Sequence, residues 1–143
     1  MRISDAMTIA LGHHRAGRLD VAEEIYRRIL AAEPEHAEAQ HLLGVAALGQ
    51  GRPEEAIAAI QRAIALDGSQ PAFHKNLGEA FRGSGRTQEA AACYHRACAL
   101  NPAYASARYN LGLLCQEEGQ LAQAVSHYRA ALALEPDRPK AWH

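Results

Sequence analysis

The stretch that decides the fold covers residues 77–102 and reads LGEAFRGSGRTQEAAACYHRACALNP. The pattern returns 34 residues later, over residues 111–136, as LGLLCQEEGQLAQAVSHYRAALALEP. Both copies hold a Leu-Gly pair, a further glycine, and then alanine, tyrosine, alanine and proline at the same spacings. An internal period of about 20–50 residues indicates a protein assembled from stacked structural repeats. The chain is therefore expected to be a repeat protein with a 34-residue unit.

The first half of the chain keeps the same phase. Glycine occupies one position in every unit: Gly17, Gly51, Gly85 and Gly119. Alanine occupies another: Ala22, Ala56, Ala90 and Ala124. A large side chain occupies a third: Tyr26, Ile60, Tyr94 and Tyr128. The expected units, within one domain (1–143), cover about residues 3–36, 37–70, 71–104 and 105–138, and residues 139–143 read as the start of a truncated fifth unit.

Each unit is expected to fold as two helices. In the third unit, apolar residues recur at three- and four-residue steps after Pro71, and proline is favoured at the first helical position. Gly85 tolerates the left-handed conformation that commonly ends a helix. Thr87 is expected to cap the second helix, and Asn101-Pro102 to end it, because proline disfavours a helical conformation in the preceding residue. The predicted helices cover residues 3–16, 19–32, 37–49, 54–66, 71–83, 87–100, 105–117 and 121–134.

Small residues at fixed positions predict close contact between these helices. The residue after the leucine of the first helix is glycine in three units: Gly44, Gly78 and Gly112. Glycine there would let helix backbones approach more closely than a branched side chain allows. Leu77 and Tyr94 are then expected to fill the space on either side of the contact.

The composition favours helices and limits the range of possible functions. Of the 143 residues, 48% are apolar and 22% are charged, so the chain can bury a core. Alanine occurs 31 times while aromatic residues make up only 6%, which favours packed helices over an aromatic-rich β-sandwich. The formal net charge is -1, without the basic excess or stripe that nucleic-acid binders show. We therefore expect no nucleic-acid partner.

From the sequence we expect the protein to be cytoplasmic and bacterial. No window approaches the about 18 apolar residues that span a bilayer, and the first residues lack the apolar run of a signal peptide. The three cysteines fit no zinc or redox spacing, which indicates reduced thiols. Thirteen arginines against two lysines, together with the alanine content, indicate a GC-rich bacterial genome.

Residues that could perform chemistry show no active-site pattern. No two of the eight histidines have the i, i+4 spacing on one helix that metal sites commonly use. His95 and His127 fall on the second helices of different units, at unmatched repeat positions. Cys93 and His95 are two apart on a helix, so they face away from each other and form no nucleophile pair. We expect no catalytic residue, no metal and no cofactor, and predict that the chain is not an enzyme.

These residues resemble the tetratricopeptide repeat, whose 34-residue pattern is an aromatic, Leu-Gly, alanine, an aromatic, alanine and proline. The matching residues are Leu77-Gly78, Ala90, Tyr94, Ala97 and Pro102, then Leu111-Gly112, Ala124, Tyr128, Ala131 and Pro136. The first unit departs from the pattern with Ile9-Ala10, as a terminal capping repeat does. The leading tryptophan of the family appears only as Trp142. The resemblance covers nearly the whole chain and implies an all-α, right-handed α-solenoid of four helix-turn-helix repeats.

The resemblance also implies a binding groove. In that family the first helix of each pair lines a concave inner surface, in which extended peptides lie. Carried over by position, this surface is apolar near the N-terminus, with Met7, Leu11 and Leu42, and polar toward the C-terminus. The candidate groove residues are His41, Lys75, Asn76, Glu79, Arg82, Tyr109, Asn110, Leu113 and Gln116.

Asn76 and Asn110 are singled out because both precede a Leu-Gly pair. An asparagine amide offers donors and an acceptor, so it can bond a peptide backbone whatever the side chains are. Such a ladder is similar to the tetratricopeptide region of O-linked N-acetylglucosamine transferases; the alternative is that both amides are only solvated or cap locally. Lys75 and Arg82 partly resemble a clamp for acidic chaperone tails, but Glu79 shares their surface and the full set is missing.

The expected function is a protein–protein interaction scaffold that binds an extended peptide or a partner helix in its groove. The alternative is a substrate-recruiting arm of a larger enzyme, such as a bacterial glycosyltransferase that resembles the O-linked N-acetylglucosamine enzymes. A structural spacer or oligomerisation module is the third possibility. Self-association through the C-terminal end, or docking of Trp142 onto another molecule, is also expected, because the outer apolar face of helix 121–134 would lack a neighbour.

Overall fold

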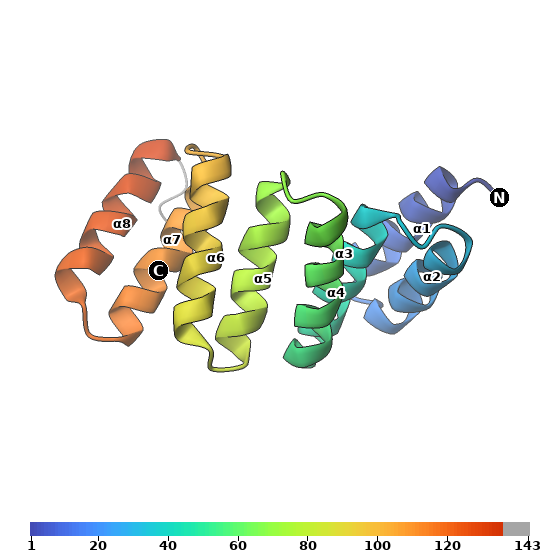
Figure 1. Cartoon of the computed structure of the whole chain (residues 1–143), viewed down its shortest axis with the longest axis horizontal. Coiled ribbons are helices and arrows are strands. Elements are labelled where there is room, and N and C mark those ends of the chain that lie inside the picture. Colours follow the sequence, from blue (N-terminus) through green and yellow to red (C-terminus); the bar gives the residue numbers. More distant parts are fainter. Residues whose placement is uncertain (136–143) are drawn as a thin grey trace.

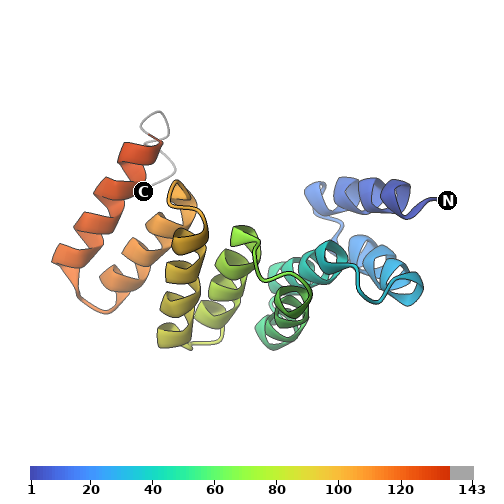
Figure 2. The same ribbon diagram turned by 45° about the horizontal axis from the view of Figure 1, so that its top comes forward.

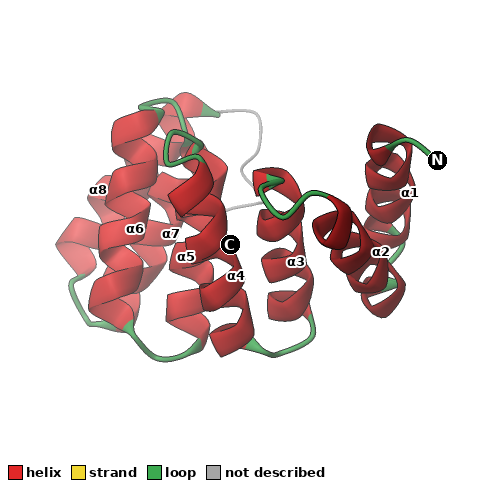
Figure 3. Cartoon of the chain, turned by 45° about the vertical axis from the view of Figure 1, so that its right-hand side comes forward, coloured by secondary structure: helices red, strands yellow, loops and turns green. Residues whose placement is uncertain are grey.

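The structure, a computed structural model, describes residues 1–135, and these form eight α-helices without a strand (Figure 3). The helices are α1 (Ile3–Arg15), α2 (Leu19–Ala32), α3 (Ala37–Gly49), α4 (Pro53–Leu66), α5 (Pro71–Gly83), α6 (Thr87–Leu100), α7 (Ala105–Glu117) and α8 (Leu121–Leu134). Every predicted helix is confirmed, with bounds that agree to within one residue. The predicted start of a fifth repeat, residues 139–143, lies outside the described residues.

Local sequence signals explain where the helices begin and end. Pro53 and Pro71 are the first residues of α4 and α5, where the missing N–H of proline costs no helical hydrogen bond. Within residues 1–135, positive φ angles occur only at the repeated glycines, including +78° at Gly85 between α5 and α6. A residue with a Cβ rarely adopts this left-handed conformation, which explains why glycine returns at this position.

The expected cap at Thr87 is wrong. Thr87 is already the first residue of α6, and the N-cap residue is Arg86, whose side chain makes no capping hydrogen bond. Arg86 instead donates from Nε and Nη2 to the two carboxylate oxygens of Glu89, at 2.8 and 2.6 Å. The first turn of α6 is therefore bridged by a bidentate ion pair rather than by a hydroxyl cap.

The helices form a curved row of hairpins. Each helix packs against the next one along the chain, and α3 also contacts α5, so first helices of successive pairs lie side by side. Figures 1 and 2 show the four pairs following one another along an arc from α1 to α8. The architecture is an α-solenoid, as predicted. None of the helices in the described part of the chain is long and apolar enough to cross a bilayer.

The core is built from large side chains that sit against glycine. Tyr26, Ile60 and Tyr94, which share one repeat position, are fully buried. A Cβ built at Gly78 would lie 2.6 Å from Cε1 of Tyr94, and one at Gly112 would lie equally close to Tyr128. These glycines thus admit a tyrosine ring from the second helix. At both positions the room left by the missing side chain is taken by an aromatic side chain of the second helix, while at Gly44 an added Cβ would also lie 3.1 Å from the backbone oxygen of Ala56 on α4.

Candidate functional site

Polar side chains link the first helices of neighbouring repeats. Asn76 on α5 donates from Nδ2 to Nε2 of His41 on α3, at 2.7 Å. Asn110 on α7 donates from Nδ2 to Oε1 of Glu79 on α5, at 3.2 Å. Arg82 on α5 donates from Nε to Oε1 of Glu117 on α7, at 3.0 Å. We call this set the inter-repeat ladder; its members are His41, Asn76, Glu79, Arg82, Asn110 and Glu117.

His41 anchors the N-terminal end of the ladder from a buried position. Its ring lies 4.4 Å from the ring of Phe73, measured between centroids. An amide nitrogen only donates, so Nε2 of His41 must accept from Asn76, and the ring proton lies on Nδ1. That nitrogen faces the Glu38 carboxylate at 3.8 Å. The candidate groove residue His41 is therefore a support for Asn76 and offers little surface to a ligand.

The two asparagines are held with one end of each amide committed. Asn76 is half-buried and Asn110 is buried, and each uses Nδ2 for its ladder bond. The carbonyl oxygen Oδ1 of each amide is left as an acceptor, a role that suits a peptide N–H. The ladder thus fixes the orientation of both amides.

The cations of the polar surface are already paired. Lys75 Nζ lies 3.6 Å from Oε1 of Glu79, and Arg82 is bonded to Glu117. Both lysine and arginine therefore have their charge balanced by a neighbouring carboxylate. A partial resemblance to a clamp for acidic tails finds no support in this arrangement, since a free carboxylate would have to displace a resident one.

The remaining candidates, Tyr109, Leu113 and Gln116, lie on α7, the first helix of the last repeat. The rings of Tyr109 and Tyr128 are 5.5 Å apart between centroids, and Tyr128 Oη donates to Oε1 of Gln116 at 2.6 Å. Leu113 is half-buried, and Gln116 is exposed. The structure thus gathers Tyr109 and Gln116 around one tyrosine of the second helix.

The predicted apolar half of the groove is corrected. Met7 and Leu42 are buried in the core that α1, α2 and α3 share, and Leu11 packs against it. These three side chains are therefore used for packing and leave little apolar surface for a groove ligand. Glu117 was missed as a site residue; its signal in the sequence is a carboxylate 35 residues after Arg82, the same offset that separates His41 from Asn76.

A second network lies between the first two repeats, centred on the buried carboxylate of Glu23. This carboxylate accepts hydrogen bonds from Arg52 at 2.6 Å, Gln50 at 2.8 Å and Arg27 at 2.9 Å. Burial alone would raise the pKa of Glu23, but the bonds from Arg52 and Arg27 outweigh it and hold the pKa below the ordinary 4.5. In the sequence, this network could have been found from Glu23 itself, which places a carboxylate at the repeat position that the apolar Ile57 occupies in the second unit.

Replacement of this carboxylate is expected to cost stability in a pH-dependent way. Glu23→Gln should lower the free energy of unfolding by about 1 kcal/mol at neutral pH, because charged hydrogen bonds are lost. Because the pKa of Glu23 is below 4.5 in the folded state, its charged carboxylate stabilises the protein above pH 4.5. This stabilisation is lost as the pH falls through the folded-state pKa and the carboxylate becomes protonated. Urea unfolding should therefore show the difference from wild type shrinking between about pH 5 and pH 3.

Glu24→Gln is the matched control, since Glu24 lies on the same helix in an exposed, 3.4 Å pair with Arg28. Exposed pairs of this kind contribute about 0–1 kcal/mol. A Glu23→Gln effect that is no larger than the Glu24→Gln effect, or that does not change with pH, would contradict the assignment.

The described residues offer no arrangement typical of an active site. His95 and His127 do come together, with ring centroids 6.3 Å apart, although their repeat positions differ. Within residues 1–135, no cluster of three histidine, cysteine or carboxylate side chains is placed to hold a metal ion. Burial raises the pKa of Cys93 to about 11, so this thiol stays protonated at neutral pH.

Four helical hairpins of 34 residues with linked first helices define a helical-repeat protein of the class that generally serves as a protein-interaction scaffold. Three family models match the chain: a tetratricopeptide repeat model over residues 7–71, a TPR repeat model over residues 78–119 and another tetratricopeptide repeat model over residues 105–138. The chain belongs to the tetratricopeptide repeat family, as its sequence pattern indicated. No curated protein matches it.

Solved structures show the same fold. A crystal structure of MamA is 29% identical, with a TM-score of 0.82, and the match covers 93% of this chain and 78% of that chain. A mutant of the Thermobaculum terrenum O-GlcNAc transferase is 30% identical, with a TM-score of 0.77, over 79% of this chain and 22% of that chain. PilF of Pseudomonas aeruginosa has a TM-score of 0.88 over 96% of this chain and 63% of that chain; at 24% identity this is a likeness of fold alone.

Proposed function

We propose that the chain binds an extended peptide segment of a partner protein along the inner face of α3, α5 and α7. The observation that supports this most strongly is the inter-repeat ladder, which holds the amides of Asn76 and Asn110 by one end and leaves Oδ1 of each as an acceptor. The two amides stand at the same position of successive repeats. Two acceptors in one repeat phase suit an extended backbone, whose N–H groups recur at a regular rise.

The residues proposed to contact the peptide are those of the polar surface with exposed or half-exposed side chains. They are Lys75, Asn76, Glu79, Arg82, Tyr109, Leu113 and Gln116; the proposal adds the largely buried Asn110, which would contact the peptide through Oδ1, and His41 as a support. The paired charges of Lys75 and Glu79 favour a ligand that is neither strongly acidic nor strongly basic. Backbone recognition by amides would give such a site broad sequence tolerance.

The double variant Asn76→Ala, Asn110→Ala tests this function. Loss of two peptide hydrogen bonds should weaken binding about tenfold or more, while the helix content stays unchanged. The probe is the tightest-binding peptide from an array of random 15-residue sequences, with its affinity measured by fluorescence anisotropy. Asn101→Ala is the control, since Asn101 lies in the loop after α6 and bonds only its own turn through Ala103 N. Equal affinities for the double variant and the control would refute the proposal.

A second candidate is favoured by the likeness to the O-GlcNAc transferase structure. That match covers only 22% of the other chain, so it concerns a helical part of a much longer protein. On this reading the chain is the substrate-recruiting arm of a larger glycosyltransferase-like enzyme, and the peptide in the groove is the substrate. The experiment above applies to both candidates, and sequencing of the gene around this segment separates them.

The proposed setting is a bacterial cytoplasm, with residues 1–143 acting as one domain of repeats 3–36, 37–70, 71–104 and 105–138. The three cysteines are free, as is usual in a reducing compartment.

We also propose self-association through α8, because its apolar residues Leu121 and Val125 are exposed. The proposed docking of Trp142 lies outside the described residues.

A further inference from the structure

The two ends of the solenoid expose apolar residues whose counterparts in other repeats are buried or half-buried. Ile9 on α1 is 42% exposed, whereas Leu77 and Leu111, its counterparts on α5 and α7, are 7% and 2% exposed. Val125 on α8 is 45% exposed, whereas its counterpart Ile57 on α4 is 7% exposed. Since the side chains are similar in kind, the difference comes from what packs over each position.

Inside the chain, these two repeat positions line the same clefts between neighbouring repeats. A cleft between the first and second repeats is lined by Glu23 of α2 and by Leu43 of α3. A second cleft, 68 residues further along, is lined by Ala91 of α6 and by Leu111 of α7. Each cleft thus lies between a second helix and the repeat that follows it, and the same pair of repeat positions lines it.

Ile9 and Val125 belong to two series of residues that recur every 34 positions, and each lies in a terminal repeat of the row. Ile9 begins the series that continues through Leu43, Leu77 and Leu111, and no second helix precedes it among the described residues. Val125 continues the series of Glu23, Ile57 and Ala91, and no described helix follows it. Ile9 and Val125 are thus exposed at repeat positions whose counterparts line a cleft between neighbouring repeats.

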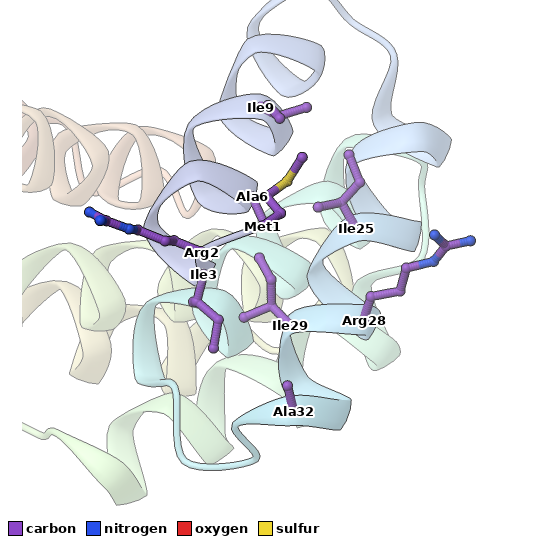
Figure 4. A pocket seen from close by; sticks show the side chains of 9 residues that line it. All are labelled: Met1, Arg2, Ile3, Ala6, Ile9, Ile25, Arg28, Ile29 and Ala32. Carbon is purple, nitrogen blue, oxygen red and sulfur yellow. The ribbon is translucent and has the colours of Figure 1, made fainter.

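Ile9 lies at an apolar pocket at the N-terminal end of the row (Figure 4). It has a volume of about 350 Å³ and lies between α1 and α2. Its apolar lining comes from Ile3, Ala6 and Ile9 of α1 and from Ile25, Ile29 and Ala32 of α2, together with Met1, and Arg2 and Arg28 complete the lining. Ile25 shares its repeat position with Ala59 and His127, which line the two internal clefts, so this pocket occupies the equivalent place in the first repeat.

We propose that molecules of this chain stack head to tail, with α8 of one molecule seated in the pocket between α1 and α2 of the next. Val125 then takes the place beside Ile9 and Ile25 that Ala91 has beside Leu111 and His127 in the lining of the internal cleft. This inference rests on the self-association proposed for α8 and adds the surface that α8 meets. The contact joins two different surfaces, so each molecule keeps one free end and the stack is open.

Two single substitutions test the pairing by analytical ultracentrifugation. Wild-type protein should gain average mass steadily with concentration, past that of a dimer. Ile9→Asp blocks the pocket and Val125→Asp blocks the α8 face, so each variant alone should be monomeric. An equimolar mixture of the two should form a dimer and nothing larger, because only one intact surface of each kind remains. Leu66→Asp, an exposed apolar position on α4 in the middle of the row, should associate like wild type.

Each other outcome overturns a defined part of the account. If Ile9→Asp still associates while Val125→Asp does not, α8 pairs with itself, and the stacking is wrong although self-association through α8 holds. Wild-type protein that stays monomeric at about 1 mM overturns both. A mixture of the two variants that remains monomeric overturns the stacking as well. Circular dichroism confirms that the variants fold, and their peptide affinity, which the stacking does not involve, tests the groove separately.

Discussion

Tyr94→Ala is expected to lower the free energy of unfolding by about 3–5 kcal/mol, the range typical of a buried aromatic replaced by alanine. Tyr94 has no exposed surface and belongs to the core cluster that joins α4, α5, α6 and α7. Its removal would leave a cavity beside Gly78, which has no side chain to fill the space. Because a small domain is stable by only about 5–15 kcal/mol, equilibrium urea unfolding should show a large shift of the midpoint.

Three further variants separate ring packing from hydroxyl chemistry. Tyr128→Ala should cost less, because this tyrosine occupies the same position in the last repeat but is only partly buried. Burial raises the pKa of Tyr94, so its phenol stays a neutral donor, and Oη has no partner among the described residues. Tyr94→Phe should therefore be neutral or slightly stabilising. Tyr26→Phe should cost about 1 kcal/mol, because Tyr26 Oη is hydrogen-bonded to Nδ1 of His14 at 3.0 Å. Equal effects of the two phenylalanine variants would contradict this reading.

Gly78→Ala is expected to destabilise the protein by about 1–3 kcal/mol through overpacking. The new Cβ would lie 2.6 Å from Cε1 and 2.8 Å from Cδ1 of Tyr94, closer than carbon atoms approach one another. The tyrosine ring is enclosed, so it cannot move aside without disturbing the core. This cost outweighs the gain of about 1 kcal/mol that alanine brings over glycine inside a helix.

Gly12→Ala and Gly112→Ala are the controls for that substitution. Gly12 lies inside α1, has no atom within 4 Å of the added Cβ, and has no positive φ, so alanine should stabilise by about 0.5–1 kcal/mol. Gly112 has the same short approach to Tyr128, but that ring is partly exposed and can yield, so the loss should be smaller than at Gly78. Thermal unfolding of all three variants measures the order. A Gly78→Ala protein as stable as Gly12→Ala would refute the proposed packing.

The helices could be predicted from the sequence because their signals are local. Proline at the start of α5 and glycine with positive φ at Gly85 act within a few residues of the chain, and the 34-residue period repeats such signals from one unit to the next. Among these helix signals, only the predicted N-cap at Thr87 is wrong, because Arg86 is the N-cap residue and forms an ion pair with Glu89.

The site could be predicted only in outline. The repeat placed Asn76 and Asn110 correctly on neighbouring first helices, but their partners depend on side-chain reach across the repeats. His41 was assigned to the groove surface, whereas Phe73 of the next repeat covers it. Glu117 pairs with Arg82 although the two belong to different units, and no local pattern marks that pair. Contacts between repeats thus decide which polar residues remain available.

The most direct test of the central claim is a nuclear magnetic resonance titration of the isotope-labelled protein with the best peptide from the array. The account predicts that shifts concentrate on α3, α5 and α7, and that the side-chain amide signals of Asn76 and Asn110 are among the most perturbed. Shifts confined to the second helices α2, α4, α6 and α8, with both asparagine side chains unmoved, would contradict it.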